Sequence, residues 1–121
     1  NRWLNNRHLL MSVIDKAKEH FDSLEIKCIE VPEWSDENEV FKVYAKPLTL
    51  GEMSKLQKYA KNDDVALMAY CLIHKCLDAE GNKMFDLNDK HDLMNNVDQK
   101  VVTKIATEIM SVQSIEVQAK K

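Results

Sequence analysis

The chain has 121 residues, a length that suits one domain with a single hydrophobic core. It is 45% apolar and 31% charged with a net charge of -3, so it lacks the basic excess of a general nucleic-acid binder. Only two glycines and two prolines occur, which favours helices over a many-turned β-sandwich or barrel. With three cysteines, an odd number, and no secretory apolar segment, we expect free thiols in a reducing cytoplasm.

The first ten residues differ in composition from the rest of the chain. Both arginines, Arg2 and Arg7, lie there, whereas every later basic residue apart from histidine is a lysine, and Met11 looks like a natural start. We expect residues 1–10 to derive from an expression vector or from translated upstream sequence, the alternative being an ordinary N-terminal helix extension.

A helix and a β-hairpin are predicted in the first half of the chain. Ser12 can cap a helix that runs to about Asp22. Its apolar residues are spaced for one face: Val13, Ile14, Ala17 and Phe21. Alternating apolar residues predict strands over residues 24–31 and 39–46, and the short connection between them predicts an antiparallel hairpin.

The sharpest local signal is a helix start directly after the second strand. Thr49 and Glu52 form T-x-x-E, a capping box, and Leu48 and Met53 occupy the positions of a hydrophobic staple. The apolar face of this helix is predicted to comprise Leu50, Met53, Leu56, Tyr59 and Ala60.

The stretch over residues 63–78 predicts the helix around which the fold is built. Every residue from Val65 to Ile73 is apolar or aromatic, so the helix should be buried on several sides. It is shorter than the roughly 20 apolar residues that span a bilayer. We therefore expect an α+β, mainly helical fold, with about four to five helices packed around this central helix and a two-stranded antiparallel hairpin.

The last part of the chain predicts a turn and two further helices. Gly81 supplies a turn, Asn88 can start a short helix, and Asn96 begins an N-x-x-Q cap for the final helix. The apolar stripe of that helix is predicted to comprise Val97, Val101, Ile105, Ala106, Ile109, Met110 and Val112. We expect a single globular domain over residues 11–114 and a flexible tail over residues 115–121.

Two groups of residues have the composition of metal ligands. Cys71 and His74 would share a helix face, but Cys76 would point about 140° away from Cys71, and no second ligand pair exists at zinc-finger spacing. Core thiols beside a surface histidine are the favoured interpretation.

A short acidic segment later in the chain has the spacing of a calcium loop. Asp78, Glu80 and Asn82 match the opening of such a loop, but Lys83 stands where a glycine is needed and Asp89 where a glutamate is needed. We expect a polar turn, and we predict no metal site and no cofactor.

The remaining candidate sites concern binding to another protein. No G-x-S-x-G motif and no glycine-rich phosphate loop occur, so we expect no enzymatic activity. Trp34 lies in an otherwise charged loop and is a candidate interface anchor; the alternative, which is slightly favoured, is that it folds back over the hairpin and covers the core. Ile115 and Val117 are apolar residues in the tail that could order against a partner.

The order of these segments resembles that of a known family. It comprises a helix, Val-Pro-Glu-Trp at residues 31–34, a strand that leads into L-T-x-G-E at residues 48–52, an apolar helix, D-x-x-G-x-x-x-F at residues 78–85, and a capped final helix. Over roughly residues 11–112 this pattern is similar to that of the tail assembly chaperones of long-tailed (siphovirus-type) bacteriophages and prophages.

The resemblance implies an α+β fold and a non-enzymatic role in building the phage tail. Such chaperones bind the aggregation-prone tape measure protein, keep it soluble and help to recruit tail tube subunits. They act in the cytoplasm of the bacterial host and are absent from the finished virion. A chaperone that coats a long partner could also form homo-oligomers. The family supplies no catalytic or metal-binding residues to transfer to this chain.

The alternative hypothesis is a small cytoplasmic adaptor or regulatory protein of prophage origin that binds a host protein. Gene order separates the two hypotheses, because a tail assembly chaperone should be encoded between the tail tube and tape measure genes. An enzyme is the third and least favoured class.

Overall fold

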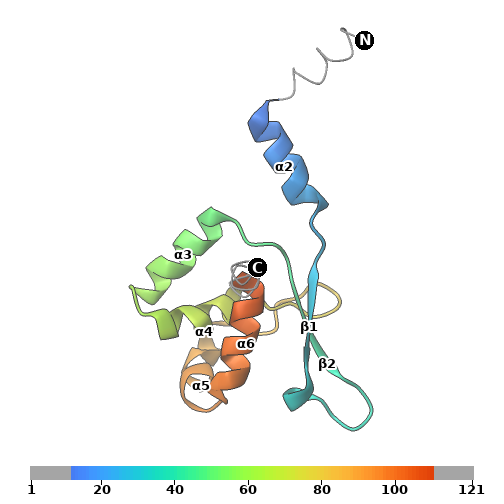
Figure 1. Ribbon diagram of the computed structural model, residues 1–121. Coiled ribbons are helices and arrows are strands. Elements are labelled where there is room, and N and C mark those ends of the chain that lie inside the picture. The colour runs from blue at the N-terminus through green and yellow to red at the C-terminus, as the bar shows by residue number, and fades with distance from the viewer. Residues whose placement is uncertain (1–11, 111–121) are drawn as a thin grey trace, which may run out of the picture.

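Most of the chain that the computed structural model describes, residues 12–110, is helical, and two antiparallel strands complete an α+β fold (Figure 1). The predicted fold class is therefore confirmed. The elements are α2 (Val13–Ser23), β1 (Lys27–Val31), η1 (Pro32–Trp34), β2 (Phe41–Ala45), α3 (Leu50–Ala60), α4 (Asp64–Lys75), η2 (Leu87–Asp89), α5 (Lys90–Asn95) and α6 (Gln99–Met110).

The hairpin has the predicted pairing but shorter strands. In β1 and β2, Ile29 faces Val43, and alternate residues on the inner face are buried. On the other side of β2, Tyr44 exchanges two backbone hydrogen bonds with Leu77, of 2.9 and 2.8 Å. This short bridge joins β2 to the segment that follows α4, while β1 contacts α6.

Helix α4 is the central element, as the sequence predicted. Asp63 caps it by accepting hydrogen bonds from the backbone N–H groups of Val65 and Ala66. Its buried residues lie on several sides of the helix, which packs against α3, α5 and α6. Among the helices of residues 12–110, none is long and apolar enough to cross a membrane.

Helix α6 covers α4 and β1 with the predicted apolar stripe, in which Val101, Ile105 and Ile109 are buried. Val112 lies outside the described residues. The predicted cap was wrong, because α6 begins at Gln99 and Asp98 accepts the hydrogen bond of the Lys100 N–H group.

The predicted start of the preceding short helix was also wrong. Asp86, not Asn88, caps η2, and it accepts a hydrogen bond from the Asn88 N–H group. Asn96 instead ends α5, where its side-chain amide donates to Asp92. Both predictions selected a neighbouring residue with similar capping chemistry.

Helix α2 is formed as predicted but stands clear of the rest of the molecule (Figure 1). Ser12 caps it by accepting from the Asp15 N–H group, and none of its residues is buried. Val13 is 80% exposed, and Ile14 and Phe21 are exposed as well. The helices α3, α4, α5 and α6 contribute buried residues to the core, whereas α2 contributes none. Only the end of α2, at Phe21 and its C-cap Leu24, lies beside the body of the protein.

Candidate partner-binding site

An apolar groove lies where the end of the hairpin, the start of α3 and the end of α6 meet. Its volume is about 440 Å³, within the range of small-ligand and side-chain pockets. The apolar residues that line it include Ala45, Leu48, Leu50, Met53, Ile109 and Met110. We refer to this feature as the α3–α6 groove.

The groove exists because the chain changes direction between β2 and α3. Pro47 has no N–H group and cannot extend the ladder of β2. Thr49 then caps α3 in an extended backbone conformation, with φ of -97° and ψ of 163°. The first turn of α3 therefore projects beyond the core, and Leu50 is 90% exposed. The predicted apolar face of α3 is therefore covered only in part: Leu56 and Ala60 are buried, whereas Leu50 is not.

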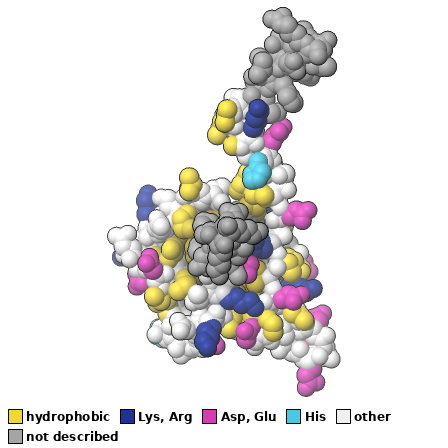
Figure 2. All heavy atoms as spheres, viewed as in Figure 1, with side chains coloured by type: hydrophobic (Ala, Val, Ile, Leu, Met, Phe, Trp, Pro, Cys, Tyr) yellow, Lys and Arg dark blue, Asp and Glu magenta, His cyan; other side chains and the backbone are white. Residues whose placement is uncertain are grey.

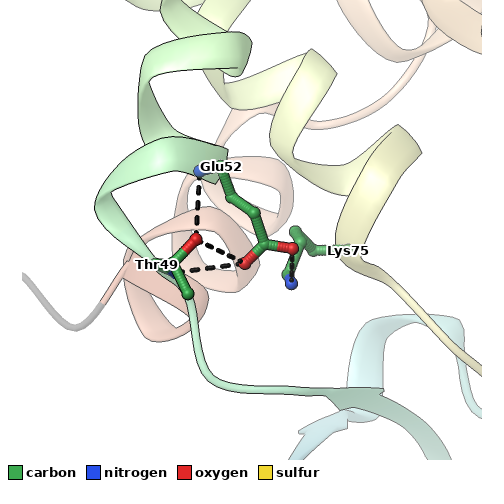
Figure 3. A network of polar contacts seen from close by, with 3 residues as sticks. All are labelled: Thr49, Glu52 and Lys75. Atoms are coloured by element: carbon green, nitrogen blue, oxygen red, sulfur yellow. Dashed lines mark hydrogen bonds and ion pairs between the residues drawn. The ribbon is translucent and has the colours of Figure 1, made fainter. Parts of the chain in front are cut away.

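A network of three side chains holds the start of α3 in place (Figure 3). The Glu52 N–H group donates to Thr49 Oγ1 over 3.1 Å, and the Thr49 N–H group donates to Glu52 Oε1 over 3.0 Å, which confirms the predicted capping box. Lys75 Nζ at the end of α4 donates to Glu52 Oε2 over 3.0 Å. The carboxylate of Glu52 thus caps α3 and joins it to α4 at the same time.

The burial of these charges is unequal, and this affects their energetics. The side chain of Lys75 is 9% exposed, whereas that of Glu52 is 43% exposed. Burial would raise the pKa of Glu52, but the hydrogen bonds from Lys75 and Thr49 together lower it below the ordinary value of 4.5. Glu52 is therefore ionised at neutral pH and serves as the counter-ion of a buried lysine.

Two lysines join the opposite wall of the groove to the sheet. Lys27 Nζ of β1 donates to the backbone carbonyl of Glu108 in the last turns of α6. Lys104 Nζ of α6 donates to the carbonyl of Glu30 in β1 over 2.8 Å. These contacts fix α6 against β1 from both elements, so the groove has walls that are held by side-chain hydrogen bonds as well as by apolar packing.

The base of α2 lies beside the groove. Leu24, the C-cap of α2, lines the α3–α6 groove. It also lines an adjoining hollow of about 390 Å³ together with Phe21 and Ile26. Figure 2 shows apolar side chains on α2, away from the body of the protein. Apolar surface therefore runs from the groove onto the exposed face of α2.

Trp34, the predicted interface anchor, is half-buried and packs against the core. Its ring makes edge-to-face contacts with Phe41, at 5.8 Å between centroids, and with Phe85, at 6.3 Å. This packing accounts for a tryptophan in a charged segment, and a role for Trp34 in binding stays a prediction. Ile115 and Val117 lie outside the described residues.

Cys71, His74 and Cys76 do not converge on a common point. Both thiols are buried, and burial raises the pKa of each to about 12, so they are protonated at neutral pH. His74 stacks on Tyr59 at 5.1 Å between ring centroids. Burial, and then the charge of Lys83, lower its pKa. No metal-ligand group of three or more side chains is found within residues 12–110.

The segment that resembled a calcium loop forms a turn of the predicted polar kind. The Asp78 carboxylate accepts hydrogen bonds from the N–H groups of Glu80 and Asn82, both at 2.9 Å. Gly81 has the predicted positive φ, of 89°. The acidic side chain is thus used to close the turn.

Comparison with protein-family models, with curated proteins and with solved structures gave no match. The functional interpretation therefore depends on the sequence resemblance and on the geometry of this chain. Sequence reasoning missed the α3–α6 groove, because it placed Leu50 on the apolar face of α3 without showing that this end of the face lies beyond the core. The available signal was the capping box itself, which places Leu50 in the first turn of a helix where neighbouring elements often end.

Proposed function

We propose that this protein is a tail assembly chaperone of a long-tailed bacteriophage or prophage. It binds the tape measure protein through the α3–α6 groove, keeps it soluble, and helps to recruit tail tube subunits around it. The protein has no enzymatic role, acts in the host cytoplasm and is absent from the finished virion. The similarity of residues 11–112 to this family supports the proposal.

The observation that carries the proposal is the apolar lining of the α3–α6 groove. Its lining exposes more apolar than polar surface, and Leu50 stands at its edge almost fully exposed. An amphipathic helix commonly binds by inserting apolar side chains into such a groove. An elongated, aggregation-prone partner presents such helices repeatedly along its length.

The composition of the groove suits a partner whose sequence varies along its length. Met53 and Met110 contribute flexible thioether side chains, which adapt to different apolar surfaces. The start of α3, which lines the groove, is held in place by the Thr49–Glu52–Lys75 network. An adaptable lining on a rigidly held helix start allows one site to accept many apolar segments of similar size. The protonated state of the two buried thiols is consistent with a non-enzymatic role.

The test is co-expression of the full chain with the tape measure protein encoded beside it. We expect a soluble complex that is recovered by affinity capture, and more soluble tape measure protein than without the chaperone. The variant Leu50→Asp should lose capture, because it places a charge at the edge of the groove.

The matched control is Leu87→Asp, which makes the same change at a leucine that is 62% exposed and does not line the groove. This variant should capture the partner as the unchanged protein does. The proposed function is refuted if the unchanged protein gives neither a complex nor a gain in solubility. The assignment of the groove is refuted if Leu50→Asp captures the partner as well as Leu87→Asp.

A further inference from the structure

Lys75 is the one charged residue that is buried within residues 12–110, and its ammonium group has few partners. Its side chain is 9% exposed, and Nζ donates to Glu52 Oε2 over 3.0 Å. An ammonium group carries three N–H donors. Among the described residues, Glu52 is the only acceptor of a hydrogen bond from Nζ. The other donors of this buried cation are therefore not used by the protein, although burial of a charge is costly unless it is well hydrogen-bonded.

The side chain of Lys75 lines an open hollow. This is the hollow of about 390 Å³ that adjoins the α3–α6 groove, and we refer to it as the Lys75 hollow. Lys75 is the most deeply buried residue of its lining. Much of the remaining lining is apolar and comprises Phe21, Leu24, Ile26 and Pro47. A group that enters the hollow therefore contacts apolar side chains as well as a desolvated cation.

The hollow offers more free hydrogen-bond donors than free acceptors. Both oxygens of Glu52 already accept, one from the Thr49 N–H group and the other from Lys75. Lys46 also lines the hollow and is exposed, and its ammonium group has no hydrogen-bond or ion-pair partner among the described residues. The second carboxylate of the lining is that of Asp22, which is exposed, so that solvent screens its charge. This balance favours a ligand that brings acceptor oxygens.

We propose that the Lys75 hollow binds a carboxylate, and that this carboxylate is an acidic side chain of the segment whose apolar residues occupy the α3–α6 groove. The two cavities share Leu24, Lys46, Pro47 and Thr49 in their linings, so one segment can reach both. A carboxylate accepts charge-assisted hydrogen bonds from ammonium groups, which are roughly twice as strong as neutral ones.

The inference adds a specific contact to an otherwise adaptable site. Apolar packing in the groove tolerates many side chains of similar size, whereas a carboxylate beside Lys75 fixes the register of the bound segment. The segments that bind are therefore amphipathic, with an acidic residue next to apolar ones. That these segments belong to the tape measure protein rests on the proposed function; the chemistry of the hollow does not.

The test compares two blocked peptides, acetyl-Leu-Glu-Leu-amide and acetyl-Leu-Gln-Leu-amide, which differ only in the carboxylate. Binding to the full chain is followed by NMR through the backbone amide signals of residues that line the hollow, such as Ile26 and Thr49. We expect the glutamate peptide to bind at least about fivefold more tightly, because charge-assisted hydrogen bonds replace neutral ones.

Lys75→Met should abolish the preference for the glutamate peptide, because methionine retains an apolar chain but has no donor. Lys55→Met makes the same change in net charge at an exposed lysine of α3 that does not line the hollow, and it should retain the preference. Urea unfolding checks that Lys75→Met is folded. Lys46→Met leaves the buried ion pair intact and should reduce the preference, so it decides the outcome if Lys75→Met does not fold.

Equal affinity for the two peptides, signal changes confined to residues outside the hollow, or a preference that survives both Lys75→Met and Lys46→Met would overturn the proposal. These failures are distinct from failure of the proposed function. If the tape measure protein is captured but the two peptides bind equally, the proposed function stands and the carboxylate site does not. If the glutamate preference is found but the tape measure protein is not captured, the site stands and the assignment of its partner fails.

Discussion

The ion pair between Glu52 and Lys75 allows a sharp test of how α3 is held against α4. The carboxylate uses one oxygen to accept from Thr49 and the other to accept from Lys75. In the variant Glu52→Gln, one of these two oxygens is replaced by an NH2 group, which cannot accept, so one of the two donors loses its acceptor. We expect a loss of about 1–2 kcal/mol in the free energy of unfolding. This loss is small for a buried ammonium group that loses its counter-ion, because the ion pair is partly solvated on the Glu52 side.

The reverse substitution should cost less, because the two side chains are unequally buried. Lys75→Met retains an apolar chain of similar length in the buried position and leaves the half-exposed carboxylate of Glu52 in contact with water. We expect it to destabilise the protein by less than about 1 kcal/mol. The double variant Glu52→Gln/Lys75→Met should be more stable than Glu52→Gln alone, because it no longer contains a buried ammonium group without its counter-ion.

Urea unfolding followed by circular dichroism measures all three variants on one scale.

The pH dependence of the free energy of unfolding provides a second readout. Because the pKa of Glu52 is lowered on folding, its contribution is complete above about pH 4.5 and is lost as the pH falls through the lowered, folded-state pKa. Glu52→Gln should remove this part of the acid sensitivity. If Lys75→Met proves as destabilising as Glu52→Gln, the unequal burial does not determine the energetics and the reasoning fails.

Three further predictions concern single positions. Asp98→Ala should cost about 1 kcal/mol in the free energy of unfolding, whereas Asn96→Ala should be nearly neutral, and equal losses in urea unfolding would contradict the assigned cap of α6. Since the pKa of His74 is lowered on folding, the free energy of unfolding should fall as the pH drops below 6.5 towards the folded-state pKa. His74→Gln should reduce this loss, and an unchanged pH profile of stability would show that His74 is not its source. Gly81→Ala should cost about 1–2 kcal/mol in thermal or urea unfolding because φ is 89°, although space exists for the added methyl group.

The parts of the fold that sequence predicted well depend on local signals. The all-apolar run between Val65 and Ile73 leaves no polar face for solvent, so burial of α4 follows whatever surrounds it. The alternation that buries Val43 and Ala45 is likewise a property of one strand. Thr49 and Glu52 specify the capping box within four residues.

The parts that it missed depend on contacts between distant segments. Nothing near Lys75 in the sequence indicates that its side chain is buried, since its counter-ion lies 23 residues earlier. The start of α6 could not be chosen between Asn96 and Asp98 from capping chemistry alone. Val97 packs against the core between them, and the helix begins after it.

The candidate site lies where the periodicity of single elements says least about the structure. The sequence predicted the apolar faces of α2 and of the start of α3, but periodicity states only that a face is apolar and cannot state what covers it. In α4 and α6 other elements of the same chain provide the cover. At Leu50 they do not, and the proposed contact with the tape measure protein lies there.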